Sequence, residues 1–363
     1  MIRATPLLIV SVALACASGP EVSRVRPHSA STARMTRIAP GVTLEVVDWG
    51  GHGSTLVFLA GLGGTAHVFD DFAPQFTDSF HVVGITRRGF GASAGAPPAA
   101  DLDTLVADIA ETLDTLRLGS VILVGHSIAG EEMTRFAELH PARCRGLVYI
   151  DAAYDRSRID TLAKVQPPAP QPRISPADTV SFNSIRAVYT RILGVREPDS
   201  EIRATVRFDS ADRFLGEVTA DSLKGRLASG NRVARYDQVH CRALAIYAVP
   251  DSLADVVPYY AELDSAGRAQ GDSLLRFVAA VVADSRAKFA RFPQNTVVDV
   301  HGANHFVFLQ RPVEVARAVR SFLSNQRLVR QPASVQSVEP HDTTNQHTSA
   351  ARRSSRRPAA AVH

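Results

Sequence analysis

The chain has 363 residues, 45% of them hydrophobic, so it can bury a large core, which excludes a wholly disordered protein. Its formal charge of +4 belongs to the C-terminal segment, because residues 327–363 contain six arginines and two acidic residues. The rest of the chain is neutral, which excludes a nucleic-acid-binding domain that depends on a basic surface.

The first 20 residues predict an export signal. Arg3 precedes a mostly apolar run at 6–15 that is too short to span a bilayer as a stable helix, and small residues follow it. Cleavage before Cys16 would resemble lipoprotein processing and would attach the protein to a membrane through the acylated cysteine. Ordinary cleavage nearby is the alternative, since Ala13 stands where lipoprotein signals usually carry leucine. Either route places the mature domain in a periplasmic or similar extracytoplasmic compartment.

From Val42 onward, strand-like runs alternate with amphipathic helical stretches, which predicts a mostly parallel central sheet flanked by helices. Residues 42–50 alternate like a half-exposed strand, and residues 54–61 form a continuous apolar run suited to burial on both faces. Residues 102–116 carry leucine and isoleucine at helical spacing behind Asp101, a plausible N-cap. Further strand-like runs begin near positions 81, 121, 145, 241 and 295.

Two insertions interrupt this alternation. Residues 152–240 are rich in proline and partly helical, and they predict a largely helical cap between core segments at 33–151 and 241–325. A second, helical insertion covers about 255–292. The final segment, 326–363, is poor in large apolar residues and predicts a disordered basic tail.

Two cysteines remain in the mature domain, and their contexts are alike. Cys144 begins "CRGLVYIDA" and Cys241 begins "CRALAIYAV", each at the start of a strand-like run. If the two strands are parallel neighbours, the thiols lie at one edge of the sheet within reach of a disulfide bond, which an oxidising compartment favours. Two buried free thiols are the alternative.

The segment "VILVGHSIAGEE" contains the candidate nucleophile, Ser127. An apolar strand precedes this serine, a helical stretch follows it, and Gly125, Ala129 and Gly130 keep the turn free of large side chains. A nucleophile elbow needs this arrangement, because the chain reverses direction sharply at the serine. The pattern therefore predicts that Ser127 is a nucleophile rather than a residue of an inert turn.

A serine hydroxyl needs a base to take its proton, and His305 is the candidate. It follows the last strand-like run and precedes the last helix, a position from which it can reach Ser127. His301 and His305 are four residues apart, but Gly302 and the strand pattern before it argue against a helical metal-binding pair. His126 is expected to be structural, because it would point away from the turn.

The acid that orients the histidine should lie between the serine and the histidine in the chain. Asp251 is the preferred candidate because it directly follows the strand-like run at 241–249 and Pro250. Asp255, a few residues further on, and Asp151, at the end of the strand before the first insertion, are the alternatives.

Two backbone N–H groups should stabilise the oxyanion of the tetrahedral intermediate. One is expected from Ile128, the residue after the nucleophile. The other is expected from Leu62, because the surrounding glycines of "AGLGGTAH" free the backbone to turn its amides inward.

Together these motifs resemble the α/β-hydrolase superfamily over about residues 35–323, apart from the insertions. The matching stretches are "LAGLGG" for the oxyanion loop, "RRGFGAS" for the Arg-Gly-x-Gly-x-Ser turn, "GHSIAGEE" for the elbow and "GANHFVFLQRP" for the histidine loop. The resemblance implies the α/β-hydrolase fold with a cap that roofs the pocket. Members with an aspartate nucleophile are disfavoured because Ser127 occupies that place. Ala60 departs from the histidine that the family often has, which changes the support of the oxyanion loop, and the gap between Asp251 and His305 is unusually long.

The sequence thus predicts an exported serine hydrolase that cleaves a carboxylic ester of a small molecule through an acyl-enzyme. Ser127 attacks, His305 relays the proton and Asp251 holds the imidazole; this chemistry requires no metal or cofactor. The alternatives are amide, lactone or carbon–carbon bond hydrolysis by the same triad, acyl transfer to an alcohol, and a ligand-binding protein on the same scaffold.

Overall fold

The computed structural model describes residues 31–156, 172, 175–229 and 234–324. The predicted export signal, with Cys16, and the predicted tail at 326–363 lie outside these residues. Within the part of the chain that is described, no helix combines the length and the apolar character needed to cross a membrane.

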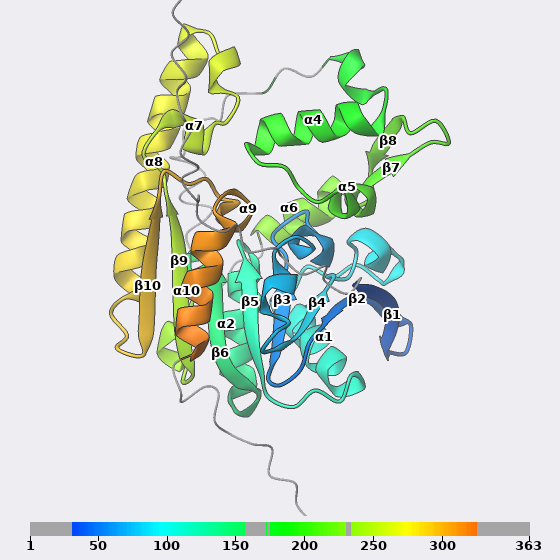
Figure 1. Ribbon diagram of the computed structural model, residues 1–363, viewed down its shortest axis with the longest axis vertical. Helices are drawn as coiled ribbons and strands as arrows, with labels where there is room; N and C mark the ends of the chain where they lie inside the picture. Colours follow the sequence, from blue (N-terminus) through cyan, green and yellow to red (C-terminus); the bar gives the residue numbers. More distant parts are fainter. Residues whose placement is uncertain (1–30, 157–171, 173–174, 230–233, 325–363) are drawn as a thin grey trace, which may run out of the picture. The chain divides into compact units, whose positions relative to one another are not determined.

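An eight-stranded sheet forms the centre of the fold (Figure 1), in the order β1-β2-β4-β3-β5-β6-β9-β10. All neighbours from β4 to β10 are parallel, whereas β1 pairs with β2 and β2 with β4 in antiparallel fashion. This confirms the predicted mostly parallel sheet. The strands are β1 (Thr32–Ala39), β2 (Val42–Gly50), β3 (Thr55–Leu59), β4 (His81–Ile85), β5 (Val121–His126), β6 (Cys144–Ile150), β9 (Arg242–Val249) and β10 (Asn295–His301).

The sequence did not predict β1, for a physical reason. This strand lies at the edge of the sheet and pairs only with β2, and most of its side chains are exposed. It therefore lacks the apolar pattern from which buried strands are identified.

Helices cover both faces of the sheet (Figure 1), and the strands are apolar on both sides as a result. In β5, for example, Leu123 packs into one hydrophobic core, whereas Ile122 and Val124 pack into the other. The first core is covered by α1 (Leu102–Thr115), α2 (Ala129–Leu139) and α8 (Ser265–Phe289). The second is covered by η1 (Ala66–Phe69), η2 (Ala73–Phe76), α9 (Val307–Gln310) and α10 (Pro312–Ser324). Shorter turns are η3 (Gly91–Gly95), η4 (Pro141–Arg143), η7 (Tyr236–Gln238) and η8 (Tyr260–Glu262).

The described part of the first insertion folds into short helices and one hairpin. Its elements are η6 (Pro176–Thr179), α4 (Phe182–Leu193), α5 (Asp199–Thr205), β7 (Val206–Phe208), β8 (Phe214–Glu217) and α6 (Asp221–Ser229). The apolar stripe of α4 buries Phe182 and Ile185 against Ile202 in a small core of its own. Ser181 caps the start of α4, and Gly194, at φ 69°, ends it in the left-handed conformation. The two-stranded β7–β8 sheet was not predicted, because both strands are short and partly exposed.

The second insertion is mainly one long helix. After α7 (Leu253–Val256), Asp264 accepts a hydrogen bond from the backbone of Gly267 and so caps α8. Helix α8 packs against β9 and β10 and covers that end of the sheet (Figure 1).

Candidate active site

The serine lies in a sharp turn between β5 and α2. Its backbone has a φ of 57°, a left-handed conformation that is strained for a residue with a side chain. The neighbouring glycines are required by space: a Cβ on Gly130 would lie 2.0 Å from the carbonyl oxygen of Ala152, and one on Gly125 would lie 2.6 Å from Met133 Sδ. Ser127 is thus held at the carboxyl end of β5, at the start of α2, as an elbow requires.

His305 reaches this serine from the loop after β10. Its Nε2 lies 2.8 Å from Ser127 Oγ. The loop is tied down by Asn304, whose backbone N–H donates to Gln310 and whose side-chain oxygen accepts from the N–H of Phe306. His126 holds the same loop, because its Nε2 donates to the carbonyl oxygen of His305 at 2.9 Å. Burial lowers the pKa of His126 well below its usual value, so this ring is neutral and structural.

The carboxylate in contact with His305 belongs to Asp151, directly after β6. Asp151 Oδ2 lies 2.5 Å from His305 Nδ1. The other oxygen accepts hydrogen bonds from the backbone N–H of Ala248 and from the hydroxyl of Tyr154. Asp151 is only 4% exposed and has a φ of 44°, so both its backbone and its carboxylate are fixed in position.

The preferred sequence candidate, Asp251, does not contact His305, and this prediction is corrected. Asp251 Oδ1 lies 3.3 Å from Nδ1 of His301, and both side chains are more than half exposed. The parallel register pairs His301 with Val249, so Asp251 lies beside the end of β10. The chain that follows β10 turns back toward the end of β5, where His305 contacts Ser127. Asp255 is not the acid either, since its carboxylate accepts the backbone N–H groups of Asp251 and Ser252 at the start of α7.

The two predicted oxyanion donors belong to two segments that meet near the serine, the loop after β3 and the turn itself. The backbone N–H groups of Leu62 and Ile128 have no hydrogen-bond partner among the residues that the structure describes. Gly61 brings the loop close to the nucleophile, because a Cβ there would lie 3.1 Å from Ser127 Cβ and 2.9 Å from His126 Nδ1. Any larger residue at this position would push the Leu62 donor away.

Arg87 supports the oxyanion loop from behind, a role that the sequence reasoning missed. Its guanidinium donates to the carbonyl oxygens of Ala60 at 3.0 Å and Gly61 at 3.3 Å. Glu132, on the elbow helix, accepts from Arg87 Nε at 2.7 Å, and both side chains are buried. These hydrogen bonds fix the two peptide groups that precede the amide of Leu62. Arg87 thus supplies support where the family often has histidine at position 60.

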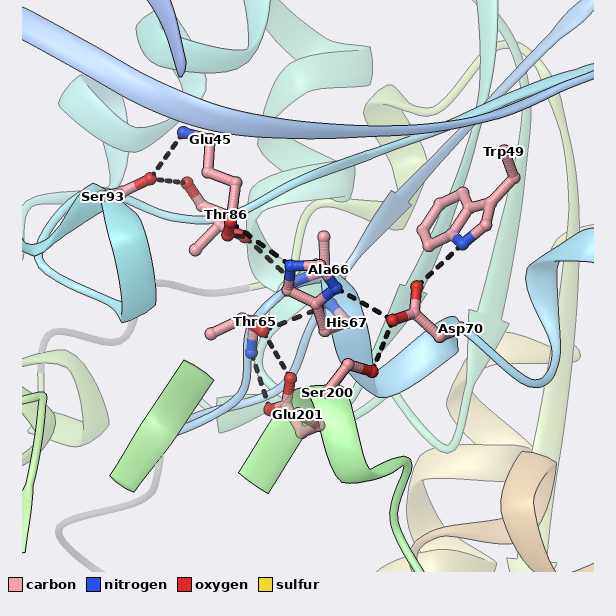
Figure 2. A network of polar contacts seen from close by, with 10 residues as sticks. All are labelled: Glu45, Trp49, Thr65, Ala66, His67, Asp70, Thr86, Ser93, Ser200 and Glu201. Atoms are coloured by element: carbon pink, nitrogen blue, oxygen red, sulfur yellow. Dashed lines mark hydrogen bonds and ion pairs between the residues drawn. The ribbon is translucent and has the colours of Figure 1, made fainter. Parts of the chain in front are cut away.

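A polar cluster lies behind the next turn of the chain, η1 (Figure 2). The two ring nitrogens of His67 contact Asp70 at 2.9 Å and Glu45 at 3.3 Å. Burial opposes the charge on His67, but the hydrogen bonds and charges of these two carboxylates outweigh it and raise its pKa to about 10. Because the pKa is higher in the folded state, the charged His67 ring stabilises the fold. The full stabilisation is present when the pH is below about 6.5, the pKa of the unfolded chain, and it is lost as the pH rises to about 10.

The cap is bonded to the same turn and to the histidine loop. Glu201, on α5, accepts hydrogen bonds from both the backbone N–H and the hydroxyl of Thr65 (Figure 2). Ser200 donates to Asp70 at 2.6 Å. At the C-terminal end of α4, the carbonyl oxygen of Leu193 accepts a hydrogen bond from Asn304 Nδ2 at 2.9 Å. The cap is therefore connected to the oxyanion loop and to the histidine loop.

Two cavities meet at His305. One, of about 290 Å³, is lined by the oxyanion loop, Ser127 and cap residues that include several carboxylates. The other, of about 330 Å³, lies on the Asp151 side and is lined mainly by apolar residues, among them Val256, Phe277 and Val281. Arg156, which the sequence reasoning also missed, lines the apolar cavity and places Nη2 3.5 Å from Ser127 Oγ. No motif marks this arginine in the sequence.

The geometry does not suit a metal at the histidines. His301 and His305 contact different carboxylates, Asp251 and Asp151. Among the residues described, no group of three or more histidine, cysteine, aspartate or glutamate side chains could hold a metal ion.

Comparison with known proteins identifies the family. The model of the Alpha/beta hydrolase family matches residues 56–318. A 2-(acetamidomethylene)succinate hydrolase of Mesorhizobium japonicum is 25% identical over 292 residues, covering 78% of this chain and 92% of that protein. The sn-1-specific diacylglycerol lipase ABHD11 of Danio rerio is 24% identical, covering 83% and 88%.

Solved structures agree on the fold. The crystal structure of E-2-(acetamidomethylene)succinate hydrolase has a TM-score of 0.58 at 20% identity, covering 81% of this chain and 99% of that one. A probable hydrolytic enzyme from Pseudomonas aeruginosa PAO1 has a TM-score of 0.55 at 18% identity, covering 81% and 94%. The two relatives named above, each matched over most of its length, are hydrolases, and the family model spans more than half of the chain. The chain belongs to the alpha/beta hydrolase family and is an enzyme of that class.

Proposed function

We propose that this α/β hydrolase is an exported serine esterase that cleaves small carboxylic esters through an acyl-enzyme. One observation carries the proposal: Ser127 Oγ, the His305 ring and the Asp151 carboxylate form a continuous hydrogen-bonded chain, with contacts of 2.8 and 2.5 Å. This is the arrangement of a nucleophile, a general base and a group that orients the base.

The roles follow from the hydrogen bonds. Asp151 accepts a hydrogen bond from the N–H at His305 Nδ1, which keeps the ring proton on that nitrogen and leaves Nε2 with the lone pair that faces the serine. As Ser127 Oγ attacks the ester carbonyl, its proton passes to Nε2, and the oxyanion receives hydrogen bonds from Leu62 and Ile128. His305 then returns the proton to the departing alcohol. Water, deprotonated by the same nitrogen, releases the carboxylic acid and regenerates Ser127.

The apolar cavity beside His305 suits the hydrocarbon part of an ester. A series of p-nitrophenyl esters of increasing acyl length tests both the activity and this assignment. A fluorophosphonate probe should label the protein at a single peptide that contains Ser127. Failure of the probe to label Ser127, together with no ester hydrolysis, would contradict the proposal, as a ligand-binding protein on this scaffold predicts. An amide that carries the same acyl group as one of these esters tests whether the enzyme is an amide hydrolase instead.

The Arg87→Lys variant should lower kcat by about ten- to a hundredfold with little change in KM. Lysine keeps a positive charge near Glu132 but cannot hold the carbonyls of Ala60 and Gly61 together, so the Leu62 donor is misplaced. Loss of a whole oxyanion donor costs roughly a hundred- to a thousandfold, and a misplaced donor should cost less. Steady-state kinetics on a neutral p-nitrophenyl ester measure the effect.

The neighbouring Arg88→Lys variant is the matched control. Arg88 pairs with Asp108 and donates to the carbonyl oxygen of Pro97, but it makes no hydrogen bond to Ala60 or Gly61, so its kcat should stay near that of the unmodified enzyme. Equal kcat values for the two variants would show that Arg87 does not support the oxyanion donor.

Export is part of the proposal, and the cysteines offer a test of it. Strands β6 and β9 are parallel neighbours, and Cys144 Sγ lies 2.9 Å from Cys241 Sγ, with both thiols free. A hydrogen bond with Cys241, together with burial, raises the pKa of the Cys144 thiol, which disfavours the thiolate needed for spontaneous oxidation. We therefore expect the disulfide bond to form in an oxidising compartment that contains a disulfide catalyst.

Protein secreted into such a compartment should lack titratable thiols at these positions and should be more stable. A bond between residues 97 positions apart should raise the free energy of unfolding by about 2–4 kcal/mol. Thiol titration in denaturant and urea unfolding, each with and without reductant, measure both effects. The Cys241→Ser variant should not respond to reductant. Two free thiols in the secreted protein would contradict the expectation.

A further inference from the structure

The cavity beside Ser127 is lined by more acidic than basic side chains. Three carboxylates from the cap line it, Glu197, Glu201 and Glu217, together with one ammonium group, that of Lys224. His126 and His305 are the other titratable groups in its lining apart from Tyr189. A small enclosed space with surplus acid favours positively charged ligands.

Two of these carboxylates already have partners. Glu217 is half-exposed at the rim, where it pairs with Lys224 and accepts a hydrogen bond from Tyr189. Glu201 accepts from Thr65 on the oxyanion side. These contacts account for Glu217 and Glu201 as structural groups of the cap.

Glu197 is different. It lies in the loop between α4 and α5, is only 9% exposed, and lines the cavity. Within the described part of the chain, no hydrogen bond or ion pair involves this side chain. Burial raises its pKa to about 7, and burial followed by the neighbouring Glu197 raises the pKa of Glu201 to about 8. A buried carboxylate without a partner disfavours folding, so its presence in the pocket calls for a ligand that supplies one.

We propose that Glu197 binds a protonated amine of the substrate and selects esters that carry one. This inference rests on the proposed esterase activity and adds the substrate class. An ammonium group supplies both the opposite charge and the N–H donor that the carboxylate lacks, and a charge-assisted hydrogen bond is stronger than a neutral one. The cavity, at about 290 Å³, limits the substrate to a small molecule.

Pairs of esters that differ only in charge test the proposal. On the alcohol side, 2-(dimethylamino)ethyl acetate is compared with 3-methylbutyl acetate, in which carbon replaces the protonated nitrogen. On the acyl side, methyl 4-(dimethylamino)butyrate is compared with methyl 5-methylhexanoate. Acid release is followed about one pH unit above the Glu197 pKa, where the carboxylate is ionised. The selectivity is the ratio of kcat/KM for the cationic ester to that for its neutral counterpart.

The enzyme should prefer the cationic member of at least one pair, and Glu197→Gln should reduce that selectivity about ten- to a hundredfold. Glutamine keeps the size of the side chain, removes the charge and replaces one acceptor oxygen with an NH2 donor. The kcat/KM of the neutral esters should change by a much smaller factor than that of the cationic esters. Glu111→Gln, on the exposed side of α1, makes the same change in net charge outside the cavity and should leave the selectivity unchanged.

Stability separates a binding role from a structural one. Because Glu197 makes no bond that the fold needs, Glu197→Gln should unfold at the same temperature as the unmodified protein or at a higher one. Unchanged selectivity in this variant, with neutral esters still cleaved, would overturn the Glu197 proposal alone. Absence of any Ser127-dependent ester cleavage would overturn the esterase proposal on which it rests.

Discussion

The Ser127→Ala variant is expected to lose about four to six orders of magnitude in turnover. Alanine cannot form the acyl-enzyme, and the remaining oxyanion donors and pocket can only assist direct attack by water. The fold should survive because, among the described residues, the serine side chain hydrogen-bonds only to His305 and Arg156, which lie beside it in the site. Steady-state hydrolysis of a p-nitrophenyl ester and the far-ultraviolet circular dichroism spectrum measure the two effects.

The Ser273→Ala variant, on the exposed surface of α8, is the control for this experiment. Its hydroxyl donates to the carbonyl oxygen of Ala269 and accepts from Arg276, both on the same helix and outside the site, so both its turnover and its spectrum should be unchanged. Near-normal ester hydrolysis by Ser127→Ala would contradict the proposed mechanism.

The Asp151→Asn variant should lower kcat by about three to four orders of magnitude, whereas Asp251→Asn should change it less than about twofold. An amide group at 151 presents an N–H to His305 Nδ1, so the ring proton moves to Nε2 and faces the serine, where a base is needed. Among the described residues, the carboxylate of Asp251 has only the exposed ring of His301 as a partner. The same neutral ester serves as substrate for both variants.

Protein stability should distinguish this effect from misfolding. The side-chain oxygen of asparagine can still accept from Ala248 and Tyr154, so Asp151→Asn should remain folded. The reverse pattern, in which Asp251→Asn is inactive and Asp151→Asn is active, would restore the acid that the sequence favoured.

The sequence predicts those parts of the site that depend on local chain geometry. The turn around Ser127 needs small residues at fixed offsets, and the glycine loop and the histidine loop are equally local, so the structure brings Ser127 and His305 together where the motifs indicate. The sheet follows in the same way from apolar runs of strand length. The edge strand β1, which buries little, leaves no such pattern.

The acid depends on which strand ends meet, and this is not local. Strand β6 lies between β5 and β9, so its end is nearer to the serine than the end of β9 is. Both aspartates follow a strand and precede the histidine in the chain. Only the order of the strands in the sheet and the turn after Pro250 determine which of the two aspartates can reach the histidine.

Arg87 and Glu201 were missed for a related reason. Their partners are 26 and 136 residues away in the chain, at Gly61 and Thr65, and no spacing rule links such positions. The contact of Arg87 with Glu132 on the elbow helix becomes visible only once the sheet places the two segments side by side.

The bonds from the cap to Thr65 and Asn304 have a consequence for engineering. A cap transplanted from a relative would bring a new pocket, and it would also have to replace Glu201 and the carbonyl of Leu193, which bond to Thr65 and Asn304 in this chain. Exchange of the cap should therefore damage the chemistry along with the specificity. A chimera would have to carry both of these anchoring groups across the splice, so the domain that chooses the substrate is not a freely interchangeable module.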